Sequence, residues 1–303
     1  MSKPAATAPA RTRASEVHLE RLRAELRRYQ RLLVAFSGGV DSTLLLQVAV
    51  ETLGTAQVLA VLGDSPSLAR SERDEAGALA QRIGARLRTV DTRELEDPRY
   101  AANPTNRCYF CKSELYTHLA ALARDEGFDA VADGTNLDDC SDFRPGRKAA
   151  EEAGVVSPLL DAGLGKQAVR ALSKRFGLPT WDKPAMPCLA SRIPYGSAVD
   201  VEKLGQIERA EAVLRAHGIR GGRVRHHGAV ARIELPESDL ARLGDVDLRA
   251  ALTRGVREAG FEFVTVDLDG YRRGRLNDAV LGTTRRKPAS EATVGDTHRS
   301  DAP

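Results

Sequence analysis

The residues most able to do chemistry lie near the start of the chain and read Ser37-Gly38-Gly39-Val40-Asp41-Ser42. An apolar run typical of a buried strand, residues 32–36, precedes them, and residues 41–52 have the composition of a helix. A turn from a strand into a helix directs backbone N–H groups at its occupant, and the helix N-terminus adds about half a positive charge. The glycines permit positive φ and close approach of an anion. We therefore predict that these six residues bind phosphate.

This phosphate loop is not of the Walker type, because no Lys follows its glycines. Hydroxyl donors are available from Ser37, Ser42 and Thr43. Asp41 is unusual in an anion site, since a carboxylate repels phosphate, so we predict that it holds Mg²⁺ or orients the loop. The six residues resemble the SGGxDS signature of the PP-loop ATP pyrophosphatases, which cleave ATP between the α and β phosphates. The resemblance implies ATP and Mg²⁺ as cofactors.

A second polar element follows a short predicted strand at residues 130–132 and reads Asp133-Gly134-Thr135-Asn136, with Asp138 and Asp139 after it. Ligands bind at the carboxyl ends of strands in open α/β sheets, so we predict that Gly134 and Thr135 contact the nucleotide. The segment Ser157-Pro158-Leu159 with Lys166 resembles another recurring PP-loop element. Lys166 then contacts phosphate or is a solvated surface residue.

The four cysteines are Cys108, Cys111, Cys140 and Cys188. Cys188 lies in a Pro-flanked turn near Arg192, whose charge favours a thiolate, although a lone cysteine is also commonly a small buried hydrophobe. The C-x-x-C pair of Cys108 and Cys111 is typical of zinc, redox or iron–sulfur sites, and no second pair completes a zinc site. With Cys188, three thiols could hold a four-iron four-sulfur cluster whose open iron binds sulfide. Cys140 is interpreted as a packing residue.

Three arginines are candidates for binding the anionic groups of a substrate, namely Arg192, Arg223 and Arg225. Because Arg223 and Arg225 alternate along a predicted strand, they share one face and could clamp one phosphate. The alternative is an exposed polar strand face. For Glu211 and Glu234, salt bridging or solvation is favoured over catalysis.

The elements that must position these residues alternate between strands and helices. Predicted strands at 32–36, 58–62, 86–90 and 130–132 alternate with predicted helices at 16–30, 41–52, 71–83 and 115–126. This order predicts an α/β fold with a parallel sheet flanked by helices, a Rossmann-like ATPase. After a Pro-rich joint at 184–196 we predict a smaller α+β domain, with helices at 201–217 and 247–259 and strands at 223–226, 230–235 and 261–268. Asp247 is the expected N-cap of the last helix.

We therefore divide the chain into a disordered segment (1–15), a PP-loop domain (16–186), an α+β substrate and sulfur-transfer domain (187–282) and a disordered tail (283–303).

The composition of the chain limits the classes of function that it could have. With 45 basic and 42 acidic residues the net charge is +3, which gives no nucleic-acid signature. No run approaches ~18 apolar residues and no secretory signal opens the chain, so we expect a cytoplasmic protein without membrane contact.

The ordered set of motifs resembles the LarE family. Beside the two elements above, it comprises Asn103-Pro104-Thr105-Asn106-Arg107-Cys108-Tyr109-Phe110-Cys111-Lys112, Arg144-Pro145-Gly146-Arg147, Trp181-Asp182-Lys183-Pro184, the run from Pro187 to Gly196, Arg223-Val224-Arg225 and Asp269-Gly270-Tyr271-Arg272. No single motif is decisive, but the ordered set is highly specific.

This resemblance implies an ATP-dependent sulfur transferase that acts on a small-molecule nucleotide, and a homo-oligomer. Such enzymes adenylate the carboxylates of pyridinium-3,5-biscarboxylic acid mononucleotide and convert them to thiocarboxylates, in the biosynthesis of the nickel-pincer nucleotide of lactate racemase. In the sacrificial version, the cysteine matching Cys188 gives up its sulfur and becomes dehydroalanine. Members with three cysteines use an iron–sulfur cluster, which here would involve Cys108, Cys111 and Cys188.

Three other functions compete with this interpretation. A PP-loop amide-forming ligase, such as an NAD or GMP synthetase, would use ammonia and need no cysteine. A tRNA thiolase would need a large basic surface, against which the net charge argues. A nucleotide-sensing module would bind ATP without releasing pyrophosphate and would leave the cysteines and arginines without a purpose.

Overall fold

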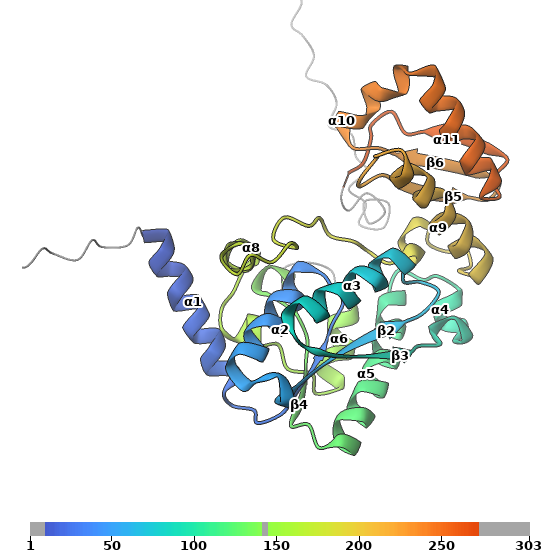
Figure 1. Ribbon diagram of the computed structural model, residues 1–303. Helices are drawn as coiled ribbons and strands as arrows, with labels where there is room; N and C mark the ends of the chain where they lie inside the picture. The colour runs from blue at the N-terminus through green and yellow to red at the C-terminus, as the bar shows by residue number, and fades with distance from the viewer. Residues whose placement is uncertain (1–9, 141–144, 273–303) are drawn as a thin grey trace, which may run out of the picture. The chain divides into compact units, whose positions relative to one another are not determined.

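A parallel sheet of four strands forms the centre of the computed structural model, which describes residues 10–140 and 145–272. The strand order is β3-β2-β1-β4. Their bounds are β1 (Leu32–Ala35), β2 (Val58–Asp64), β3 (Arg86–Asp91) and β4 (Ala130–Ala132). Each pair is parallel, and Leu32 of β1 lies opposite Val58 of β2 and Ala130 of β4. The predicted α/β fold with a helix-flanked parallel sheet is confirmed (Figure 1).

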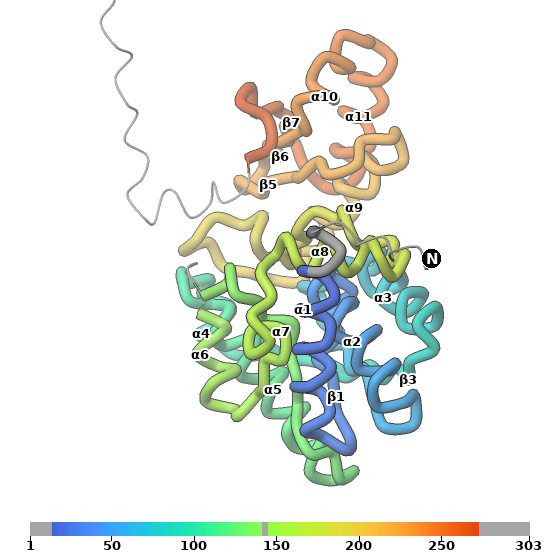
Figure 2. The backbone as a smooth tube through the Cα atoms, turned by 90° about the vertical axis from the view of Figure 1, so that its left-hand side faces the viewer, coloured from blue at the N-terminus to red at the C-terminus, as the bar shows by residue number. Residues whose placement is uncertain are grey.

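The helices cover the two faces of this sheet in separate layers. One layer consists of α1 (Ala10–Leu26), α2 (Val40–Leu53), α3 (Arg70–Ile83), α7 (Pro158–Asp161) and α8 (Lys166–Arg175). The other consists of α5 (Arg107–Glu126) and α6 (Pro145–Glu152). Figure 2 shows α1 running beside α2 and α7. Because strand side chains alternate between faces, Val34 joins the first core and Leu33 the second.

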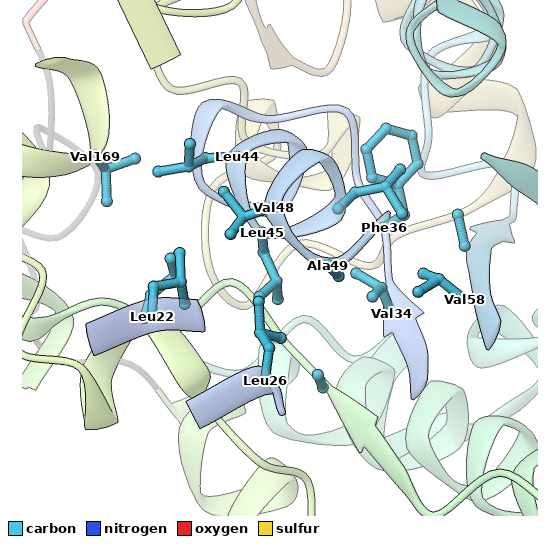
Figure 3. Close-up of a cluster of buried hydrophobic side chains, with 14 of the residues drawn as sticks. Leu22, Leu26, Val34, Phe36, Leu44, Leu45, Val48, Ala49, Val58 and Val169 are labelled. Atoms are coloured by element: carbon cyan, nitrogen blue, oxygen red, sulfur yellow. The ribbon is translucent and has the colours of Figure 1, made fainter. Parts of the chain in front are cut away.

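The helix that follows the phosphate loop is apolar nearly all round. Leu44, Leu45 and Leu46 of α2 have no exposed surface, and Leu22 and Leu26 of α1 pack in the same core (Figure 3). Truncating such a leucine to alanine typically costs about 2–5 kcal/mol. The N-terminus of α2, which carries the phosphate loop, is therefore held rigidly against the sheet.

A second, smaller sheet has the order β5-β6-β7. Its strands are β5 (Arg223–His227), β6 (Val230–Glu234) and β7 (Phe263–Val266), with β5 and β6 antiparallel and β6 and β7 parallel. The two-residue turn between β5 and β6 is Gly228-Ala229, and its first residue has a φ of 64°, which suits glycine. Helices α9 (Val201–Ala216) and α11 (Val246–Glu258) contribute to its apolar core, while α10 (Glu237–Leu240) follows β6. The predicted smaller α+β sheet region is thus present.

Three predicted boundaries are wrong. Helix α1 begins at Ala10, inside the segment 1–15 that we predicted to be disordered; residues 1–9 lie outside the described residues. Helix α5 begins at Arg107 rather than at 115, so the C-x-x-C pair is helical. The N-cap of α11 is Asp245, whose carboxylate accepts hydrogen bonds from two backbone N–H groups, rather than Asp247.

The chain divides into compact units only after Tyr271, and both sheets belong to the first unit. The proposed domain boundary at residue 187 stays a prediction, and the predicted tail at 283–303 lies outside the described residues. Over residues 10–140 and 145–272, no helix is long and apolar enough to cross a membrane.

Candidate functional site

The phosphate loop has the geometry of an anion site. Gly38 adopts a φ of 68°, and a Cβ on it would lie 3.0 Å from Cβ of Ala76 on α3, so only glycine fits there. The backbone N–H of Ser37 donates to Ser42 Oγ at 3.2 Å, and the two serine hydroxyls lie 3.0 Å apart. The first-turn N–H groups of α2 have no partner within the helix and face an anion bound at this loop.

Asp41 ties the phosphate loop to the other predicted nucleotide elements. Its carboxylate forms an ion pair with Lys166 Nζ and accepts a hydrogen bond from Asn136 Nδ2 at 3.1 Å. A Cβ on Gly134 would lie only 2.8 Å from the backbone N of Ser42, so the loop after β4 is packed directly on the start of α2. Two segments that are far apart in sequence therefore form one surface. This arrangement matches the loop-orienting alternative for Asp41.

The residues present also fit a magnesium ion that arrives with ATP. Mg²⁺ keeps several waters and is held by one or two carboxylates together with substrate phosphates, so a single half-buried carboxylate such as Asp41 suffices. Lys166, which we expected to contact phosphate or solvent, is paired with that carboxylate. It would contribute a positive charge beside the bound phosphates.

Asp133 organises the loop after β4. Its carboxylate accepts hydrogen bonds from the backbone N–H and hydroxyl of Thr135, from Ser157 Oγ at 2.8 Å and from Tyr116 Oη at 3.2 Å. Nucleotide contact by Thr135 stays a prediction. Thr43, the third expected hydroxyl donor, is fully buried, and its hydroxyl has no hydrogen-bond partner among the described residues.

Cys188 is exposed and lies at the start of a tight turn, Leu189–Arg192, that long-range contacts hold in place. The N–H of Leu189 donates to the carbonyl of Ser67 at 2.8 Å. Arg192 is only 2% exposed, and its guanidinium donates to the carbonyls of Pro187 and Cys188. Its other side forms a bidentate pair with the buried Glu211, at 2.9 and 3.1 Å. In this arrangement Arg192 positions the cysteine turn, and its predicted contact with substrate stays untested.

The two strand arginines are buried, so the alternative of an exposed polar strand face is wrong. Arg225 is 9% exposed, pairs with Glu234 and donates to the carbonyl of Ser191 at 3.0 Å. The glutamates at 211 and 234 therefore form salt bridges, as expected.

Arg223 differs from both of these arginines. It is 4% exposed, donates to the carbonyl of Gly222 and to Met186 Sδ, and lies 5.3 Å from the ring of Tyr271. Within the described residues no carboxylate forms an ion pair with it. Burial, together with the positive charge of Arg192 and Arg225, lowers the pKa of Arg223. A buried cation without a counter-ion favours an incoming anion.

Cys111 lies on the inner side of the cysteine turn. It packs against the apolar cluster that contains Tyr100, Leu189 and Ala190. Burial raises the pKa of the Cys111 thiol, and the negative charges of Glu94 and of a Cys188 thiolate raise it further. Cys111 is therefore a protonated thiol at neutral pH. Cys108, one helical turn before it on α5, is exposed.

Glu94 supplies the charge beside Cys111. It is 1% exposed, and its Oε1 accepts a hydrogen bond from Ser65 Oγ at 2.6 Å. Its Oε2 is buried without a hydrogen-bond partner among residues 10–140 and 145–272. A buried carboxylate oxygen left unpaired is costly, which marks this residue as more than packing.

The three thiols do not fit the predicted iron–sulfur cluster. Nowhere in the described part of the chain are three metal-ligating side chains gathered closely enough to hold a metal ion. The arrangement does not support the cluster expectation, and no step below depends on one.

Sequence reasoning missed Glu94, Tyr100 and Ser67. The hydroxyls of Ser67 and Tyr100 lie 2.8 Å apart beneath the cysteine turn. A Ser, a Glu and a Tyr spread over some 30 positions form no motif, and only the fold brings them beside residues from near position 188. The sequence carried one partial signal, since Ser65 and Ser67 follow a predicted strand whose carboxyl end faces the site.

Comparisons with known proteins identify relatives of this chain. A family model described as NAD synthase matches residues 16–103, which include the phosphate loop. An uncharacterized protein of Synechocystis sp. is 48% identical over 263 residues, or 86% of this chain and 97% of that protein. An uncharacterized protein of Methanocaldococcus jannaschii is 28% identical over 80% of this chain and 91% of that protein.

A named relative decides the family. The pyridinium-3,5-bisthiocarboxylic acid mononucleotide synthase of Lactiplantibacillus plantarum is 40% identical over 258 residues, which are 85% of this chain and 92% of that protein. Identity at this level extends over most of both chains. The chain therefore belongs to the LarE family, whose members are ATP-dependent sulfur transferases of the PP-loop superfamily.

Proposed function

We propose that this protein adenylates the carboxylates of pyridinium-3,5-biscarboxylic acid mononucleotide and converts them to thiocarboxylates. The observation that carries the proposal is Arg223, a buried guanidinium without a carboxylate partner in the described residues, connected through Met186 to the segment that leads to the exposed Cys188. A mononucleotide with two carboxylates carries negative charges that such a cation would bind. The name of the relative from L. plantarum supports the same substrate class. Its product would serve the nickel-pincer nucleotide of lactate racemase.

The chemistry requires both halves of the site. A carboxylate is a poor electrophile because its leaving group would be oxide, whereas an acyl adenylate loses AMP. The N–H groups at the start of α2 would hold the departing pyrophosphate, Asp41 would hold the magnesium ion that neutralises its charge, and Lys166 would supply a further positive charge beside it. The thiolate of Cys188 then attacks the activated carbonyl carbon and expels AMP, which leaves a thioester. Removal of the Cα proton of residue 188 breaks the Cβ–Sγ bond, so the thiocarboxylate leaves and dehydroalanine remains. Arg223, with Arg225 next to it on β5, holds the phosphate of the substrate.

The test separates activation from sulfur transfer. Pyrophosphate release and thiocarboxylate formation are measured with ATP, Mg²⁺ and the biscarboxylate nucleotide for wild type, Cys188→Ala and Arg223→Met. Cys188→Ala should release pyrophosphate but make no thiocarboxylate. Arg223→Met should raise the KM for the nucleotide about 10- to 100-fold, because a charge-assisted hydrogen bond contributes about 1.5–3 kcal/mol to binding.

Cys140→Ala serves as the matched control, because the proposed chemistry gives this exposed thiol no role, and it should behave as wild type. Thiocarboxylate from Cys188→Ala, or pyrophosphate release that needs ammonia instead of a cysteine, would refute the proposal in favour of an amide-forming ligase.

A further inference from the structure

We propose that Arg107 binds the carboxylate of the substrate that is not reacting, and so selects nucleotides with two carboxylates over nucleotides with one. This inference rests on the proposed function and adds a specificity-determining residue to it. The substrate carries one phosphate and two carboxylates, and one carboxylate reacts at a time. Arg223 and Arg225 are assigned to the phosphate, which leaves the second carboxylate without a cation.

Arg107 is a buried guanidinium whose charge no carboxylate neutralises in the described part of the chain. It is 3% exposed and is the first residue of α5. Arg192 and Arg225, which are also buried, are instead paired with Glu211 and Glu234. Such pairing is the usual condition of a structural buried arginine, because an isolated buried charge is costly. A buried cation that lacks this pairing is suited to an anion that arrives from outside the chain.

An amide rather than a carboxylate fixes the orientation of Arg107. Its Nη1 donates to Oδ1 of Asn103 at 2.6 Å. Nδ2 of Asn103 in turn donates to the carbonyls of Pro194 at 2.8 Å and Ser197 at 2.9 Å. Asn103 is fully buried and has a φ of 55°, a backbone conformation that is uncommon for residues other than glycine and that these contacts maintain. The guanidinium is therefore held in place without loss of its positive charge.

The remaining donors of this guanidinium have the geometry that a carboxylate requires. Nε is buried and has no hydrogen-bond partner among the described residues, and Nη2 donates to none of them. Nε and Nη2 lie on one edge of the planar group, where a carboxylate accepts two parallel hydrogen bonds. A buried donor without a partner is costly, so a ligand that accepts from it is favoured.

Tyr195 connects Arg107 to the cysteine turn. The guanidinium lies 5.0 Å from the centre of the Tyr195 ring, and Tyr195 belongs to the segment that follows the turn. Burial raises the pKa of Tyr195, the positive charge of Arg107 lowers it, and thiolates at Cys108 and Cys188 raise it. Because the effect of a charge on a pKa decreases with distance, the phenol lies near both the guanidinium and the nucleophile. A cation for the second carboxylate is thus available close to the thiol that attacks the first.

The test compares two nucleotides that differ by one carboxylate. They are pyridinium-3,5-biscarboxylic acid mononucleotide and pyridinium-3-carboxylic acid mononucleotide, and the KM of each is measured from pyrophosphate release by the full-length protein with ATP and Mg²⁺. For wild type, the KM of the biscarboxylate should be about 10- to 100-fold lower, the effect of one charge-assisted hydrogen-bonded pair. Arg107→Gln keeps a donor for Asn103 but should lose this preference, with the KM of the monocarboxylate nearly unchanged. Arg107→Lys keeps the charge without the fork of donors and should retain part of the preference.

Arg223→Met is the matched control, because the phosphate is common to both nucleotides. It should raise both KM values by the same factor and keep the preference. Calorimetry with the α,β-methylene analogue of ATP, which is not cleaved between the α and β phosphates, measures the Kd of each nucleotide without catalysis and should show the same pattern. Circular dichroism establishes that the variants are folded.

Three results would overturn the proposal. They are the absence of a preference in wild type, equal losses for the two nucleotides in Arg107→Gln, and a preference that disappears in Arg223→Met instead. The last result would assign the phosphate to Arg107. If wild type binds the biscarboxylate preferentially but releases no pyrophosphate, the proposed function fails while the assignment of Arg107 stands.

Discussion

The phosphate loop and the Cys188 site are both proposed to bind anions, but they supply positive potential in different ways. The loop is six consecutive residues whose backbone N–H groups supply the positive potential, and its one charged side chain, Asp41, is half-buried and paired with Lys166. The Cys188 site uses Arg192, Arg223 and Arg225, and two of these are matched by the buried glutamates at 211 and 234. A site made of backbone N–H groups therefore depends on closely packed glycines. A site made of arginine side chains depends on carboxylates from distant segments that compensate the buried charge.

Gly134→Ala should break the first kind of site and gives the largest expected effect. The added methyl group would lie 2.8 Å from the backbone N of Ser42, so the loop after β4 and the start of α2 must separate. A misplacement of about 1 Å at a reacting centre costs about 100-fold in rate, and we expect at least that loss in ATP-dependent pyrophosphate release. Gly77→Ala on α3, where a methyl group meets nothing within 4 Å, is the control and should retain activity. Activity of Gly134→Ala within a few-fold of wild type would contradict the packing argument.

Arg192→Leu should break the second kind of site. It leaves Glu211 as an unpaired buried carboxylate, so we expect a loss of about 3–5 kcal/mol in the free energy of unfolding, measured by urea denaturation. Adding Glu211→Leu should restore most of it, because an apolar pair of similar volume replaces the ion pair. Arg223→Leu, which leaves no partner carboxylate behind, should cost much less. Equal losses for Arg192→Leu and Arg223→Leu would show that charge compensation does not distinguish them.

Glu94→Gln should produce the smallest effect of the three substitutions, and it tests how a buried charge changes the pKa of a neighbouring cysteine. Removing the negative charge should lower the pKa of Cys111, measured from the pH dependence of its alkylation, while Cys108 is unchanged. Because folding raises this pKa, the buried thiol stabilises the protein below the ordinary cysteine pKa of about 8.5, and this stability is lost as the pH rises above it. The loss should be smaller in Glu94→Gln. Glu96→Gln is the control, because Glu96 is an exposed residue on the same turn. An equal decrease in the pKa of Cys111 in Glu96→Gln would contradict a specific effect of Glu94.

The fold was largely predictable because its signals are local. Apolar runs at β1 and β2 and the periodicity of α2 and α3 define buried strands and amphipathic helices within windows of about ten residues. The start of α5 was missed, since the C-x-x-C pair was interpreted as a separate motif although neither Gly nor Pro interrupts residues 107–126. The cap of α11 was misplaced by two residues because Asp245 and Asp247 are chemically equivalent candidates.

The sequence by itself determined the strand-to-helix loop at residues 37–42, the α/β order of elements and the family, since each depends on residues that are adjacent or follow in a fixed order. Only the tertiary structure decided that Arg192 is paired with Glu211, that Arg223 has no such partner in the described chain, and that Cys111 packs against the Cys188 turn. The physical reason is that burial and charge compensation depend on which distant segments meet. That choice is made by the packing of the whole chain, and no short window of sequence contains it.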